Sequence, residues 1–213
     1  CPVAANAAET RRTNQGREAP GNVHDELGAS GQLLAEIPRR HFLGRSHMAS
    51  SFASSPDQLA QAFAAVGAVI HRIEPDQWAA PTPCTEWPVR RVVGHLVGMN
   101  LVFAAMLADE ALPARFEIAD EDLAAQYDSS AELLVSRFSA PGTLDRDLGG
   151  PMGSASGAER LQIRLYDLIA HGWDLARATR QPLILPDDVV EGSLAFATVQ
   201  LEGIDRDGRF QPA

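Results

Sequence analysis

Apolar residues recur with a helical period along five segments of the chain, the first of which is predicted to be a helix from about residue 55 to 73. In that segment, Leu59, Phe63, Val66 and Ile70 follow one another at spacings of three and four residues, which is the pattern of one face of an α-helix. The same reasoning predicts helices over about 88–107, 120–138, 157–179 and 186–201. Long amphipathic helices with short or medium connections indicate an all-α fold, here a four-helix bundle with an additional C-terminal helix.

Capping residues mark where two of these helices begin. Ser55 stands three residues before Gln58, and Ser156 stands three residues before Glu159. In both places the serine hydroxyl can accept from a backbone N–H of the first turn while the longer side chain reaches back, which is a capping box. The Gly-rich stretch 149–157 is predicted to be a loop with room for a short hairpin.

The first fifty residues differ from the rest of the chain because they carry no sustained apolar period. They are rich in Gly, Asn, Arg and Ala, and they end in SHMAS at residues 46–50, which resembles the end of an expression-vector tag. We therefore predict that residues 1–50 are a vector-derived leader and that residues 51–213 form the folded domain.

Composition and charge argue against several classes of protein. All 18 basic residues are arginine, 28 residues are acidic, and the formal net charge is −10, unlike the clustered positive charge of a nucleic-acid groove. Cys1 and Cys84 are too few for a disulfide framework or a four-thiolate zinc site. No apolar run approaches the roughly 18–20 residues that a membrane span needs. We expect a cytoplasmic protein that binds neither nucleic acid nor membrane.

Three residues of the predicted bundle have the chemistry of metal ligands. Asp167 and His171 are four residues apart on one predicted helix, so their side chains project from the same face. His95 lies among apolar neighbours on another helix and would complete a site within the bundle. The spacing leaves other interpretations open, because His95 could be a hydrogen-bonded core residue and Asp167 with His171 an ordinary intrahelical pair. Arg164, three residues before Asp167, could also neutralise the carboxylate.

Other chemically distinctive side chains are expected to have structural roles. Trp87 and Trp173 are expected to anchor the core. His71 stands near the end of its helix beside Arg72 and is expected to be a solvated surface residue.

Two motifs resemble those of a known family. The first is PTPCTEWPVRRVVGHL at residues 81–96, and the second is DLIAHGWDLARAT at residues 167–179. Together they are similar to the mycothiol-dependent maleylpyruvate isomerase-like proteins within the wider DinB-like superfamily, over roughly residues 55–213. The resemblance implies an up-and-down four-helix bundle that holds a divalent metal ion through two histidines and a carboxylate. Matched by motif, those ligands are His95, Asp167 and His171, and many relatives carry Glu in place of Asp167.

The resemblance and the ligand set suggest two hypotheses about function. Three protein ligands leave coordination positions open, as in catalytic metal sites. The first hypothesis is a metal-dependent S-transferase or isomerase that uses a small-molecule thiol such as mycothiol and an electrophilic substrate. Zinc is the metal we expect, and Ni, Fe or Mn would also suit these ligands. The second is a non-catalytic metal-binding scaffold or dimer module, and a homodimer is compatible with both. The arginine-only composition fits an actinobacterial source, where mycothiol is the low-molecular-weight thiol.

Overall fold

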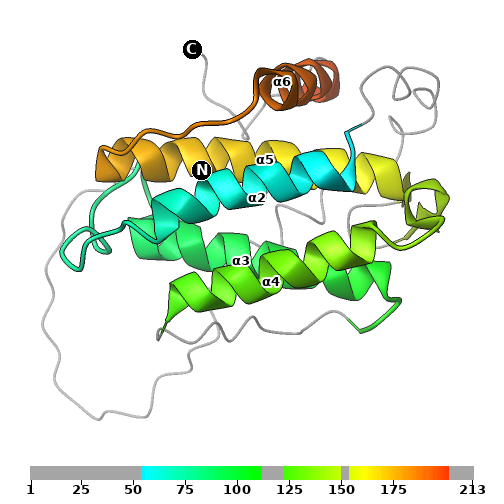
Figure 1. The fold of residues 1–213 in the computed structure, drawn as a ribbon, viewed down its shortest axis with the longest axis horizontal. Coiled ribbons are helices and arrows are strands. Elements are labelled where there is room, and N and C mark those ends of the chain that lie inside the picture. The colour runs from blue at the N-terminus through cyan, green and yellow to red at the C-terminus, as the bar shows by residue number, and fades with distance from the viewer. Residues whose placement is uncertain (1–53, 112–121, 150–153, 202–213) are drawn as a thin grey trace, which may run out of the picture.

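Five α-helices make up most of the residues that the computed structural model describes, which are 54–111, 122–149 and 154–201 (Figure 1). They are α2 (Pro56–Ile70), α3 (Val89–Leu107), α4 (Leu123–Phe138), α5 (Gly157–Thr179) and α6 (Asp187–Leu201). Between α4 and α5 lie a 3-10 turn, η3 (Thr143–Asp145), and two short strands, β1 (Asp147–Leu148) and β2 (Ala155–Ser156), which pair antiparallel. Each helix begins and ends within about three residues of its predicted bounds.

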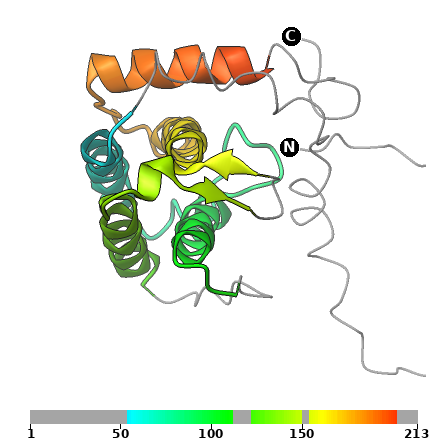
Figure 2. The same cartoon turned by 90° about the vertical axis from the view of Figure 1, so that its right-hand side faces the viewer.

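The helices α2 to α5 pack side by side as a four-helix bundle, and α6 crosses over one side of it (Figure 2). Around the bundle, α2 contacts α4 and α5, and α3 contacts the same two helices. The helices α2 and α5 run in one direction, whereas α3 and α4, although consecutive in the chain, both run in the other (Figure 1). The predicted all-α bundle with an additional C-terminal helix is confirmed. The up-and-down order that the resemblance implies is wrong for α3 and α4, because these consecutive helices run in the same direction rather than antiparallel (Figure 1).

Both predicted capping boxes are present. The hydroxyl of Ser55 accepts from the backbone N–H of Gln58 at 3.2 Å, and the side chain of Gln58 accepts from the backbone N–H of Ser55 at 3.0 Å. At the start of α5, Ser156 and Glu159 make the same reciprocal pair at 3.2 and 2.8 Å. These bonds satisfy N–H groups that have no partner inside the helix, which fixes where α2 and α5 begin.

The core lies along the centre of the bundle and includes the predicted apolar face of α2. Leu59, Phe63, Val66 and Ile70 are each at most 5% exposed. They pack with buried residues of the other three helices in one cluster, which includes Leu96, Phe103, Leu134, Phe138, Leu161, Leu165 and Leu168. Burial of this apolar face, rather than local propensity, supplies most of the stability of such helices.

The helix α3 is long and apolar enough, by length and composition alone, to cross a membrane. Within the described part of the chain it is the one helix that meets this criterion, and 61% of its most apolar stretch is buried inside the protein. A helix of a bundle has this composition when much of its surface packs against other helices.

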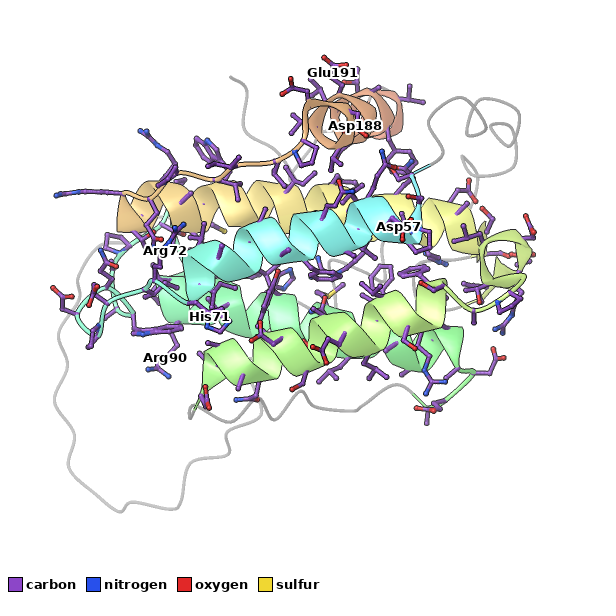
Figure 3. All side chains as sticks on the ribbon, viewed as in Figure 1. Asp57, His71, Arg72, Arg90, Asp188 and Glu191 are labelled. Atoms are coloured by element: carbon purple, nitrogen blue, oxygen red, sulfur yellow. The ribbon has the colours of Figure 1, made fainter. Side chains whose placement is uncertain are left out.

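The C-terminal helix α6 is attached to the bundle by polar and aromatic contacts. The side chain amide of Gln58 in α2 donates a 2.8 Å hydrogen bond to Asp188, which lies directly above α2 in Figure 3. The rings of Tyr166 in α5 and Phe196 in α6 lie 6.2 Å apart. The helix α6 therefore covers the side of the bundle that α2 and α5 form. The leader predicted at residues 1–50 lies outside the described residues.

Candidate metal centre

The second turn of α3 and the middle of α5 bring His95, Asp167 and His171 together. Nε2 of His95 is 3.4 Å from Oδ1 of Asp167, and Nε2 of His171 is 3.6 Å from the same oxygen. One ligand atom from each of the three residues lies within 4.8 Å of the others. Their side chains are between 17% and 24% exposed, so the cluster lies at an edge of the bundle that solvent reaches.

His171 is oriented by Asp174, one turn further along α5. Oδ2 of Asp174 lies 3.0 Å from Nδ1 of His171, so in the neutral imidazole this hydrogen bond places the proton on Nδ1. The lone pair of the ring is then on Nε2, the atom that faces Asp167. A carboxylate that holds the distal N–H of a histidine in this way is the common outer partner of metal-binding histidines in proteins.

Asp167 is held as an anion. Burial raises the pKa of its carboxyl group, but the hydrogen bond from His95 and the positive charge of Arg164 outweigh this effect, and the pKa is well below its usual value. Nη1 of Arg164 donates a 2.7 Å hydrogen bond to Oδ2 of Asp167. Arg164 therefore does pair with the carboxylate, as the sequence suggested. The guanidinium binds Oδ2, whereas the two histidine nitrogens face Oδ1.

Trp87 packs against both imidazole rings. Its ring centroid lies 4.8 Å from that of His95 and 5.6 Å from that of His171, the second at an interplanar angle of 22°. The preceding loop is closed by local hydrogen bonds, in which Thr82 donates to the carbonyl of Trp87 at 2.7 Å. Sequence reasoning expected a core anchor here and missed this contact, although Trp87 stands only eight residues before His95 and next to the proline that begins α3.

The donor set fits a divalent transition-metal ion. Two ligand atoms of a tetrahedral zinc ion, each about 2.1 Å from the metal, are separated by about 3.4 Å. The two distances from Oδ1 of Asp167 to the histidine nitrogens, 3.4 and 3.6 Å, match this separation. An imidazole lone pair that faces a carboxylate oxygen is repulsive unless a cation or a proton lies between them. The arrangement is therefore one that a bound cation would stabilise.

The remaining candidate residues lie elsewhere. His71 is at the end of α2, half-exposed as expected, and its Nε2 lies 2.8 Å from Oδ2 of Asp128 (Figure 3). The expectation that Trp173 anchors the core is wrong, because its side chain is 53% exposed. Two positions after His171 a helix has turned by about 200°, so Trp173 points away from the buried face and packs instead under the guanidinium of Arg177.

Comparisons with known proteins agree with the fold. Residues 59–176, more than half of the chain, match the family model of the mycothiol maleylpyruvate isomerase N-terminal domain. The chain is 30% identical over 133 residues to the uncharacterized protein Rv0738 of Mycobacterium tuberculosis, across 62% of this chain and 71% of that protein. It is 33% identical to the uncharacterized protein Rv0036c of the same organism, across 52% of this chain and 51% of that protein. No solved structure matches the chain.

The family match covers both the α3 turn that carries His95 and the α5 segment that carries Asp167 and His171. The extent of the match, together with the helical fold, assigns the chain. It belongs to the mycothiol maleylpyruvate isomerase N-terminal domain family.

Proposed function

We propose that the chain binds one divalent metal ion through His95, Asp167 and His171 and acts as a metal-dependent thiol S-transferase or isomerase. The observation that carries this proposal is the convergence of three acceptor atoms within 4.8 Å on a solvent-accessible edge of the bundle. Zinc is the metal we favour, because two imidazoles and one carboxylate with open positions are a common catalytic zinc set, while Ni, Fe and Mn also accept these ligands.

The side chains around the site have distinct roles in this proposal. A bound ion would supply the Lewis acidity that holds a small-molecule thiol as its thiolate at neutral pH. His95 and His171 offer neutral nitrogen lone pairs, Asp167 offers one negative charge, and Asp174 keeps the proton of His171 away from the ion. Trp87 stacks on the face of His171 and packs at a tilt against His95, so it shields that side of the site from water.

The thiol is proposed from the family to which the chain belongs, whose description names mycothiol. Mycothiol would be the thiol substrate and a small electrophile the second substrate. We propose that neither a nucleic acid nor a membrane takes part and that the location is cytoplasmic. The acidic balance of the chain, with a net charge of −10, supports the exclusion of nucleic acid.

Elemental analysis tests the metal site. Protein purified without chelator should carry about one divalent ion per chain, as expected for a single three-ligand site. His95→Ala and His171→Ala should each lose most of it, because two remaining ligands do not retain an ion through purification. Unchanged metal content in both variants would contradict the site.

A thiol-consumption assay on the metal-loaded protein tests the chemistry. With mycothiol and a panel of electrophiles, the loaded protein should consume thiol faster than the chelator-treated protein or the His171→Ala variant. Metal bound at one ion per chain without any thiol consumption would favour the second hypothesis, a non-catalytic metal-binding scaffold or dimer module.

A further inference from the structure

The two oxygens of Asp167 have different surroundings. Oδ1 faces both histidine nitrogens, at 3.4 Å from His95 and 3.6 Å from His171. Oδ2 instead accepts the 2.7 Å hydrogen bond from Nη1 of Arg164. Rotation of the carboxylate that brought Oδ2 toward the histidines would break this charge-assisted bond, which is among the stronger kinds in proteins.

The guanidinium of Arg164 is held in place by hydrogen bonds and by an aromatic ring. Its side chain is fully buried, and its Nε and Nη2 both donate to Oδ1 of Asn100, at 3.0 and 2.7 Å. Nη2 also donates to the backbone carbonyl of Leu96 at 3.3 Å, and the guanidinium lies 5.6 Å from the ring centroid of Phe63. A buried arginine with contacts to α2, α3 and its own helix has no freedom to release Asp167 at low cost.

Asn100 determines the direction in which Arg164 points. Its Oδ1 accepts two bonds from the guanidinium, while its Nδ2 donates to Oγ of Ser130 in α4 at 3.0 Å. Oγ of Ser130 in turn donates to the carbonyl of Tyr127 at 2.9 Å, so the serine presents a lone pair to the amide. The amide therefore cannot flip, and one chain of bonds connects α4, through α3, to the carboxylate on α5.

We infer that Arg164 is a positioning residue that makes Asp167 a ligand through Oδ1 alone, and that Asn100 aims Arg164 for this purpose. The inference rests on the proposed metal site. It adds a determinant of metal choice, because a carboxylate restricted to one oxygen suits ions with few ligands, such as zinc, better than ions that take bidentate carboxylates. Arg164 also offsets the charge of Asp167, so the ion would keep more of its own positive charge toward a thiol.

Cobalt substitution measures this effect without reference to activity. The visible absorption bands of Co²⁺ are intense in four-coordinate sites and weaken as the coordination number rises. Arg164→Met frees Oδ2, so its Co²⁺ bands should be weaker than those of the unchanged protein. Its zinc affinity, measured by competition with a chromophoric chelator, should fall by about 10–100-fold, the usual effect of losing an outer partner of a ligand. Arg164→Lys, which keeps one charged donor, should recover part of the band intensity.

The control is Arg177→Met, the same substitution at an exposed position of the same helix, which should leave spectrum and affinity unchanged. Because Arg164 is buried and its replacement costs stability, Ser130→Ala provides a milder test. It removes the hydroxyl that accepts from Nδ2 of Asn100, together with its own bond to the carbonyl of Tyr127, and should shift the Co²⁺ spectrum in the same direction. If the unchanged protein binds Co²⁺ but Arg164→Lys and Ser130→Ala give identical spectra and affinities, the inference is wrong. If the unchanged protein binds no ion, the proposed metal site itself is wrong.

Discussion

Metal binding should raise the thermal stability of the protein, and the triad should be the origin of the increase. His95 and Asp167 are 72 residues apart in the chain, so the unfolded state offers only the Asp167–His171 pair as a weak site. An ion that binds the folded state alone adds about 2.7 kcal/mol at a free concentration of 100 times its Kd. For a domain of this size 1 kcal/mol corresponds to about 2–4 °C in Tm, so saturation with zinc should raise Tm by about 5–11 °C.

The assay is a melt followed by circular dichroism, with zinc titrated into chelator-treated protein. His95→Ala should abolish the rise in Tm because it leaves only the two ligands on α5. The matched control is His71→Ala, since His71 also pairs with a carboxylate, Asp128, and at 2.8 Å lies closer to its partner than His95 does to Asp167. This control should keep the full rise, because its pair lies at the surface and has no third ligand. A rise that persists in His95→Ala, or one that His71→Ala loses, would refute this reasoning.

Three further predictions concern the fold. Gly172→Ala should lower the free energy of unfolding by about 1–3 kcal/mol in denaturant, because the added Cβ would lie 2.6 Å from Cγ2 of Val66 between α5 and α2. The control Gly192→Ala should leave the free energy of unfolding unlowered, because nothing lies within 4 Å of its added Cβ. Ser156→Ala should cost about 1 kcal/mol in the same measurement, because it removes the capping box of α5, and an unchanged midpoint would show that the cap contributes nothing. Limited proteolysis should trim the chain before about Ser55 and leave a core that melts like the full chain, as expected if the leader at residues 1–50 takes no part in folding; loss of the core on trimming would contradict that assignment.

The positions of the helices could be predicted from the sequence because the forces that set them act over a few residues. A 3.6-residue apolar period and the Ser55 and Ser156 capping boxes are local features, and they placed the helix bounds within about three residues. The Asp167–His171 pair could be predicted for the same reason, since residues four apart on a helix face the same direction whatever the helix packs against.

The predictions about Trp87 and Trp173 had different outcomes. Both are large aromatic residues next to apolar runs, and the sequence suggested a core role for each. Trp87 does pack against the core cluster and in addition contacts both imidazoles of the candidate site, whereas Trp173 is exposed. Whether an aromatic ring is buried depends on which face of its helix or loop another element covers, and that element lies far away in the chain.

The meeting of the α3 and α5 residues was decided only by the tertiary structure. The sequence offered His95 as a third ligand, from its place on another helix and then by resemblance, but its 3.4 Å distance to Asp167 depends on how α3 packs against α5. The contacts of Arg164 with Asn100, 64 residues earlier in the chain, had no local signal at all. Local sequence sets the direction of a side chain on its own helix, whereas the partner it reaches is set by the packing of whole helix faces, which is a property of the complete core.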